Sequence, residues 1–294
     1  MRWSGLLRAI VLAIGEFMTA MGNHEFLQRA LLTAILIGIS AGIIGAFVIL
    51  RGMSLMGDAI GHAVLPGVAL SFLFGINPVI GAVVFGLIAS SFIGFIGDKS
   101  TLKKDTVMGV VFTSFFALGI VLISLIPTRV HVHSILFGNM LTVTPERLNT
   151  MWIVTITLVA LVVLFYKELL LSSFDETSAQ VYGLNTKLIH YLFMFVLTLV
   201  IVLSLQITGA ILIVAMIITP AATAFLLTNQ MHWMIVISAF LGFISAVVGI
   251  FVSFTFDVSS GSSIVIVAAC WFVLAFAFAP KKGILAQMKR KNTN

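Results

Sequence analysis

Residues 188–228 read LIHYLFMFVLTLVIVLSLQITGAILIVAMIITPAATAFLLT and contain no Asp, Glu, Lys or Arg. One membrane-spanning helix needs about 20 consecutive apolar residues, so this run is long enough for two. We expect spans at 188–206 and 207–228, with a weak boundary at Gln206–Thr208. Apolar residues that are continuous rather than alternating indicate transmembrane helices and exclude a β-barrel.

The whole composition agrees with that stretch. Of 294 residues, 61% are hydrophobic and 9% are charged, whereas a soluble domain has about half and about a quarter. Further apolar windows occur at 27–50, 59–76, 79–97, 106–126, 151–170, 233–256 and 262–280. The sequence therefore predicts an all-α polytopic membrane protein with about eight or nine transmembrane helices and no separate soluble catalytic domain. Its one cysteine, Cys270, excludes a disulfide framework or a thiolate metal cluster.

The basic residues predict the orientation, because cytoplasmic loops carry an excess of Lys and Arg. The stretches 98–105, 167–187 and 281–294 together hold ten such residues, and the opposite side holds three, Arg29, Arg129 and Arg147. We therefore expect a cytoplasmic C-terminus. The net charge of +6 reflects these loops rather than affinity for nucleic acid.

The chain divides into an N-terminal extension at 1–23, a transmembrane permease domain at 24–281 and a basic cytoplasmic tail at 282–294. A basic start followed by a short apolar stretch is typical of a signal peptide, but Glu16 interrupts the apolar residues. We interpret residues 5–22 as an interfacial helix or an extra span, with a cleaved signal peptide as the alternative.

Motifs for direct use of ATP are missing from the sequence. It contains no G-x-x-x-x-G-K-[ST] pattern. His24-Glu25 begins like a metalloprotease motif, but Gln28 stands where the second histidine should be. The chain is therefore predicted to be a conduit and not an enzyme, with its energy source elsewhere.

Asp58 and His62 are the most informative polar residues. Their i, i+4 spacing places them on one face of a helix. A carboxylate oxygen and an imidazole nitrogen form half of a site suited to Mn, Fe or Zn. Nearby glycines and Pro66 would break the helix, and transporters commonly build binding sites at broken helices. The alternative is that Asp58 is a helix N-cap and His62 a satisfied core histidine.

This segment resembles a known family. RGMSLMGDAIGHAVLPGVAL, at 51–70, is similar to the signature of the permease subunits of manganese/zinc/iron ABC importers. The similarity continues at Ile135–Asn139, at Ser173–Asp175 through Tyr182–Leu184, and at Ile218–Thr223, so it covers most of the chain from about residue 24.

The resemblance implies a permease of the vitamin-B12-importer (type II ABC importer) architecture in the bacterial plasma membrane. Its implied partners are ATP-binding cassette ATPase subunits, a metal-binding receptor lipoprotein or periplasmic protein, and a second permease copy. Asp58 and His62 would contact the transported ion. The wording of the signature favours manganese, with zinc or iron as alternatives; no cofactor is bound permanently.

The resemblance also supports a role for one further segment, and the chemistry of other residues suggests further candidates. A short cytoplasmic helix ended by Gly183 would dock into the ATPase, with the alternative of an ordinary linker; its candidate residues are Asp175, Glu176, Gln180, Tyr182 and Gly183. Pro66 and Pro220 are candidates for gating, with plain helix packing as the alternative. His131 and His133 either capture metal at the entrance or lie in a solvated loop, which we favour. Gly38, Gly42 and Gly45 predict a small-residue packing face.

Two other functions remain open at this point. A proton-coupled secondary metal transporter could use Asp58 and His62 without any ATPase. A permease for an organic metal chelate would share the fold but would not need a paired Asp and His.

Overall fold

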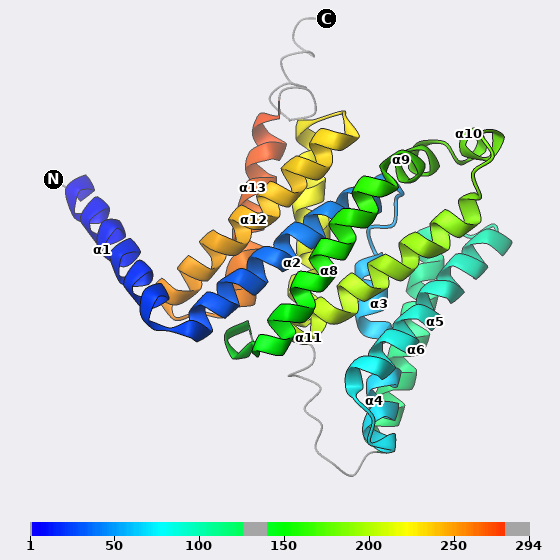
Figure 1. The fold of residues 1–294 in the computed structure, drawn as a ribbon, viewed down its shortest axis with the longest axis horizontal. Helices are drawn as coiled ribbons and strands as arrows, with labels where there is room; N and C mark the ends of the chain where they lie inside the picture. Colours follow the sequence, from blue (N-terminus) through cyan, green and yellow to red (C-terminus); the bar gives the residue numbers. More distant parts are fainter. Residues whose placement is uncertain (1, 126–139, 280–294) are drawn as a thin grey trace, which may run out of the picture.

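The computed structural model describes residues 2–125 and 140–279, and these residues are helical with short connections (Figure 1). The elements are α1 (Arg2–Asn23), α2 (Glu25–Leu50), α3 (Met56–Ala63), α4 (Leu65–Phe74), α5 (Pro78–Lys99), α6 (Lys104–Ser124), η1 (Met140–Thr142), α8 (Pro145–Leu164), α9 (Tyr166–Phe174), α10 (Glu176–Val181), α11 (Thr186–Leu227), α12 (Met231–Phe256) and α13 (Ser260–Phe278). Within the described ranges, eight segments are long and apolar enough to cross a membrane, with α3 and α4 taken together as one. The predicted all-α polytopic fold is confirmed.

The long helix α11 consists of two helices joined at Gly209. This residue has φ 78° and ψ 166°, a conformation essentially confined to glycine. In Figure 1 the chain reverses direction there, so that the second half of α11 runs back across the bundle. The predicted boundary at Gln206–Thr208 therefore ends one residue before the observed break at Gly209. Because α11 counts once among the eight segments, its two halves bring the candidate crossings within the described ranges to nine.

Close contact between backbones holds the centre of the bundle together. A Cβ atom added to Gly38 would lie 2.5 Å from the carbonyl oxygen of Gly242, and one on Gly42 would lie 2.6 Å from that of Ser238. The Ser238 hydroxyl also donates to the Gly42 carbonyl at 2.7 Å. Gly45 packs equally closely on Ile217 of α11. The predicted small-residue face is confirmed, and it packs α2 against α12 and α11.

Two predicted spans differ from the observed helices. The span at 151–170 was wrong at both ends, because α8 begins at Pro145 and ends at Leu164. Phe165, at φ −106° and ψ 25°, separates α8 from α9, although the apolar residues continue into α9 and obscure this break in the sequence. The span at 59–76 is two helices, α3 and α4, which meet at Val64.

The helix α1 lies at the edge of the molecule, extending away from the bundle (Figure 1). It is not among the eight segments that could cross a membrane. Phe17 attaches it to α12, since its ring centroid lies 5.5 Å from those of both Phe251 and Phe254. The interfacial role of residues 5–22 stays a prediction.

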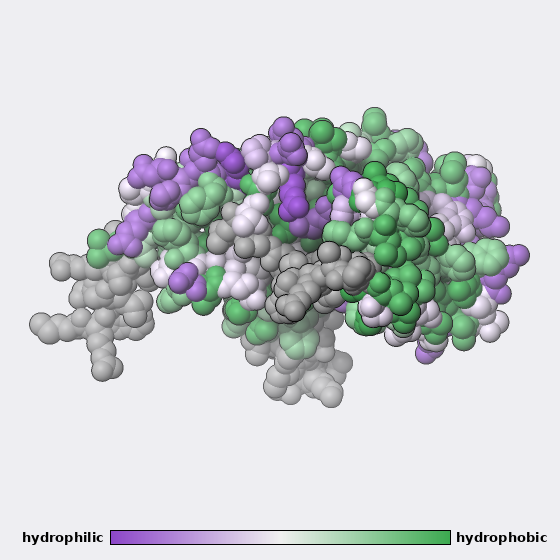
Figure 2. Space-filling model, turned by 90° about the horizontal axis from the view of Figure 1, so that it is seen from below, coloured by the Kyte–Doolittle hydropathy of each residue, from purple (hydrophilic) through white to green (hydrophobic). Residues whose placement is uncertain are grey.

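The outer surface is apolar where lipid is expected. Figure 2 shows hydrophobic residues over much of the part formed by α4, α5 and α6. Phe74, Phe92 and Phe95 are among the exposed residues there. In Figure 1 the α5–α6 connection, α9, α10 and the end of α13 all lie toward the same side of the molecule. The charge count assigns these segments to one side.

Candidate functional site

The short helix α3 carries the Asp58–His62 pair. The chain leaves α2 through Arg51 and turns at Gly52, whose φ is 65°. The Met53 N–H then donates to the Val48 carbonyl at 3.0 Å, which folds the connection back against α2. α3 lasts only eight residues, and Pro66 lies in the first turn of α4 directly after it. The predicted broken helix is observed.

Asp58 and His62 share one face of α3, as their spacing predicted. His62 Nε2 lies 3.3 Å from Asp58 Oδ1, and 21% of the His62 side chain and 43% of the Asp58 side chain remain exposed. Leu55, not Asp58, occupies the N-cap position of α3. His62 Nδ1 is buried and has no hydrogen-bond partner among the described residues. The N-cap half of the alternative is not observed, and His62 has a side-chain partner at Nε2 but none at Nδ1.

Aromatic rings of α6 cover one side of the pair. The ring centroids of Phe112 and Phe116 each lie 5.2 Å from that of His62. Apolar surroundings lower the local dielectric and strengthen an interaction between the carboxylate and a cation. The described part of the chain contains no group of three or more His, Cys, Asp or Glu placed to hold a metal ion. One copy therefore presents two donors, half of a tetrahedral set.

A cavity of about 260 Å³ lies on the side of the molecule that carries α10. Its lining residues are Met53, Ile93, Gly94, Gly97, Asp98, Lys104, Val107, Met108, Glu176, Lys187, His190 and Met194. Lys104, Met108 and Phe112 follow one another at four-residue spacing on α6, so they share one face of that helix. Lys104 and Met108 on this face line the cavity, and Phe112 on the same face contacts His62.

Sequence reasoning missed this cavity. Its charged residues, among them Asp98, Glu176 and Lys187, come from separate elements, α5, α10 and α11. Only the four-residue spacing along α6 could be read from the sequence, and in an apolar helix that spacing also fits ordinary packing.

The predicted short helix ended by Gly183 is confirmed as α10. Asp175 caps its N-terminus, with Oδ1 accepting the backbone N–H groups of Thr177 and Ser178, each at 3.0 Å. The Ser178 hydroxyl donates to Asp175 Oδ2 as well. This bond first, and then the backbone bonds, hold the pKa of Asp175 below its usual value. At the other end Gly183 has φ 81°, and the Leu184 N–H donates to the Ala179 carbonyl at 3.0 Å.

The α10 segment exposes apolar side chains. Val181 is 82% exposed, Tyr182 is 78% exposed, and Phe174, just before the helix, is 61% exposed. Gln180 turns back instead and donates to the Thr186 hydroxyl at 3.1 Å. Large apolar side chains on a short polar helix are typical of a surface that binds a protein.

The two candidate gating prolines lie in different settings. Pro66 packs against Gly119 of α6, where an added Cβ would lie 3.0 Å from the Pro66 nitrogen. Pro220 is buried inside the second half of α11, and the residue of α11 with non-helical dihedral angles is Gly209. The candidates His131 and His133, and the matching stretch Ile135–Asn139, lie outside the described residues.

A polytopic helical bundle with a polar pair on a broken helix, and with a separate short helix at one end, defines a membrane-spanning transport subunit. Residues 23–279 match the ABC 3 transport family. The chain belongs to this family.

Two relatives are similar over nearly their whole length. The manganese transport system membrane protein MntC of Listeria monocytogenes is 52% identical over 278 residues, covering 94% of this chain and 98% of the relative. The manganese import system permease protein ScaB of Streptococcus gordonii is 50% identical, with 95% and 99% covered.

Two solved structures share the fold. PsaBC from Streptococcus pneumoniae in complex with Fab has a chain with a TM-score of 0.83 and 48% identity, covering 94% of this chain and 99% of that one. An inward-facing ABC transporter described as of metal-chelate type has a TM-score of 0.68 at 18% identity, which supports the fold alone. The chain is thus a permease subunit of an ABC transporter, and ATP hydrolysis belongs to a separate component.

Proposed function

We propose that this chain is the permease of an ATP-driven importer whose substrate is Mn²⁺. The observation that carries the proposal is the partly exposed Asp58–His62 pair, with oxygen and nitrogen donors 3.3 Å apart. The names of the MntC and ScaB relatives, at 52% and 50% identity, support manganese. Zinc and iron remain as alternatives because both accept the same donors.

The chemistry of the pair suits a divalent ion in transit. The Asp58 carboxylate offsets part of the cost of removing water from the cation, and the His62 imidazole supplies a neutral donor. Two copies of the chain, facing each other across an axis, would contribute two carboxylates and two imidazoles. Water or backbone carbonyls would complete a six-coordinate manganese shell.

The remaining partners follow from the two ends of the molecule. In this proposal α10 docks into an ATP-binding cassette ATPase through Val181 and Tyr182, which are exposed on a polar helix. The same side holds the α5–α6 connection, α9 and the end of α13, and in this proposal it faces the cytoplasm because the basic stretches 98–105 and 167–187 lie in or next to these segments. A metal-binding receptor delivers the ion to the opposite face. In this proposal the permease domain at 24–281 carries the ion across the membrane.

The test is manganese accumulation in bacterial cells that lack their own importer, with membrane expression checked for every variant. Asp58→Asn keeps the shape and one oxygen donor but removes the negative charge, and His62→Ala removes the nitrogen donor. Both should abolish uptake, or nearly so, while the complex still assembles. Asp105→Asn and His232→Ala are the matched controls, because both residues are exposed and belong to other helices, α6 and α12.

The proposal fails if Asp58→Asn and His62→Ala both transport at the wild-type rate. Competition by Zn²⁺ and Fe²⁺ in the same cells decides the ion. If a tenfold excess of either suppresses manganese uptake completely and that metal accumulates instead, manganese is not the main substrate.

A further inference from the structure

Arg51, between α2 and α3, joins three parts of the molecule. Its Nε donates to the Ser173 hydroxyl and its Nη2 to the Ser172 hydroxyl, both at 2.9 Å. Its guanidinium carbon lies 4.4 Å from the centre of the Phe193 ring. One side chain therefore connects the segment before α3 with α9 and with α11.

This arrangement is costly for an arginine. Neither of the two ion pairs formed between described residues includes Arg51, so its direct partners are two neutral hydroxyls and a ring. Burial lowers the pKa of Arg51 to about 10, and attraction to Glu176 offsets only part of that effect. A partly buried cation without a contacting carboxylate is unfavourable.

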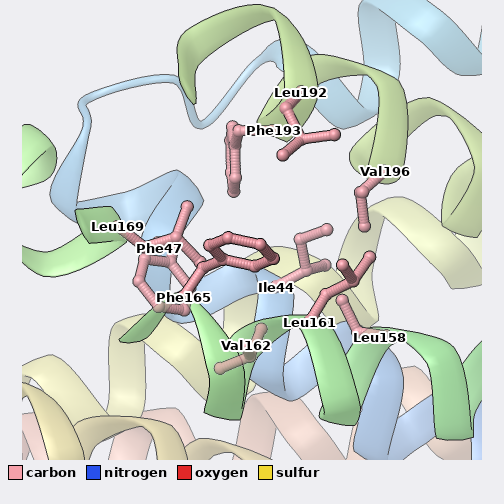
Figure 3. A pocket seen from close by; sticks show the side chains of 10 residues that line it. All are labelled: Ile44, Phe47, Leu158, Leu161, Val162, Phe165, Leu169, Leu192, Phe193 and Val196. Carbon is pink, nitrogen blue, oxygen red and sulfur yellow. The ribbon is translucent and has the colours of Figure 1, made fainter. Parts of the chain in front are cut away.

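The helix α9, which Arg51 holds, has no fully buried residue. Its core contacts include those of the partly buried Leu169 and Leu170. Beside it lies an apolar cavity of about 30 Å³, into which side chains of α2, α8, α9 and α11 point (Figure 3). The lining includes Phe47, Leu169 and Phe193. Atoms that face a void lose dispersion contacts on that side, so α9 is less tightly packed there, and the hydrogen bonds of Arg51 add a specific restraint on its position.

The residues joined by these hydrogen bonds are close in sequence to α10 on one side and to α3 on the other. Ser173 stands two residues before Asp175, the N-cap of α10. Arg51 stands seven residues before Asp58, and the Met56 N–H bonds to the Met53 carbonyl at 2.9 Å, which links the turn to the start of α3. A displacement of α10 is therefore passed to α3 through a few covalent steps and the two hydrogen bonds of Arg51.

We infer that Arg51 is a positioning residue that couples movement of α9 and α10 to the helix carrying Asp58 and His62. This rests on the proposed function, in which α10 docks the ATPase and the pair contacts the ion. Arg51 itself does not touch the ion. Its loss leaves ATP hydrolysis in place but separates it from transport.

The experiment measures manganese transported per ATP hydrolysed, with the full permease–ATPase complex in liposomes. Arg51→Gln removes the charge and the fork of donors, and it should lower this ratio by about tenfold, within the range of coupling between two sites. Arg51→Lys keeps the charge but not the bidentate fork, so it should recover the ratio only in part. Arg29→Gln, at the other end of α2, is the matched control and should leave the ratio unchanged.

A second set of variants removes only the acceptors. Ser172→Ala with Ser173→Ala should lower the ratio in wild type and change nothing further in Arg51→Gln, because both act through the same bonds. This set keeps the test decisive if Arg51→Gln fails to assemble. A merely structural role would reduce transport and ATP hydrolysis in proportion and leave their ratio constant.

The inference is overturned if the ratio is unchanged in Arg51→Gln, or in the double serine variant when Arg51→Gln does not assemble. Additive effects of the serine and arginine changes would overturn it as well. Asp58→Asn in the same liposomes separates the two proposals. If Asp58→Asn abolishes transport and Arg51→Gln leaves the ratio intact, only the coupling role is lost. If Asp58→Asn transports normally, the proposed ion site is wrong.

Discussion

Substituting Gly45 by alanine tests the close packing of α2 on α11. The new Cβ would lie 2.1 Å from the Ile217 carbonyl oxygen and 3.2 Å from the Ala221 Cβ. A carbon–oxygen contact is normally about 3.3 Å or more, so the helices must separate by about 1 Å. Overpacking of this kind costs about 1–3 kcal/mol, and the obstacle is a backbone atom that cannot rotate away.

The same partner residue supplies the control. A Cβ on Gly57 would lie 3.7 Å from Ile217 Cδ1, an ordinary contact. Alanine is favoured over glycine in a helix by up to about 1 kcal/mol. Gly57→Ala should therefore be neutral or stabilising, whereas Gly45→Ala should lose up to about 2 kcal/mol after the same gain is subtracted.

The measurement is the thermal unfolding midpoint of the purified protein in one detergent, at one scan rate, since membrane proteins often unfold irreversibly. One kcal/mol shifts the midpoint of a large domain by about 2–4 °C, so Gly45→Ala should lower it by up to about 8 °C. A midpoint for Gly45→Ala that equals or exceeds that of Gly57→Ala would refute the packing argument.

Three further outcomes are expected. In a Cys270→Ala background, an impermeant thiol reagent added outside cells should label Thr144→Cys and not Ser100→Cys; the reverse pattern contradicts the orientation. Asp175→Ala removes the acceptor that caps α10 and should reduce co-purification of the ATPase. Hydrogen bonds lower the pKa of this carboxyl, so the cap is intact above the folded-state pKa of Asp175 and is lost as the pH falls through that pKa. Gly209→Ala forces alanine into φ 78° and ψ 166°, at a cost of about 1–3 kcal/mol, and an unchanged unfolding midpoint would contradict the observed reversal.

The sequence predicted the spans because bilayer thickness fixes the length of an apolar run. It predicted the break in α11 only to within a few residues, since hydropathy does not depend on backbone dihedral angles. Gln206–Thr208 is merely the least apolar point of that run, whereas the reversal needs a residue that tolerates positive φ. Gly209 meets that need.

The contacts of Arg51 could not be predicted. Its hydroxyl partners Ser172 and Ser173 lie 121 and 122 residues away, and no local pattern relates residues at that distance. The local geometry of Asp58 and His62 was predictable for the opposite reason, since four residues on one helix fix it.

Charge explains why the proposed site would select a divalent ion without fixing which one. In the proposed arrangement each copy contributes one carboxylate, from Asp58, and one neutral imidazole, from His62. Two copies then supply two negative charges, which balance a divalent cation but leave a monovalent one undercompensated. The same four donors would satisfy tetrahedral zinc, and intrinsic affinity favours zinc over manganese. Preference for manganese therefore has to come from room for further oxygen ligands around the pair, or from the receptor that delivers the ion.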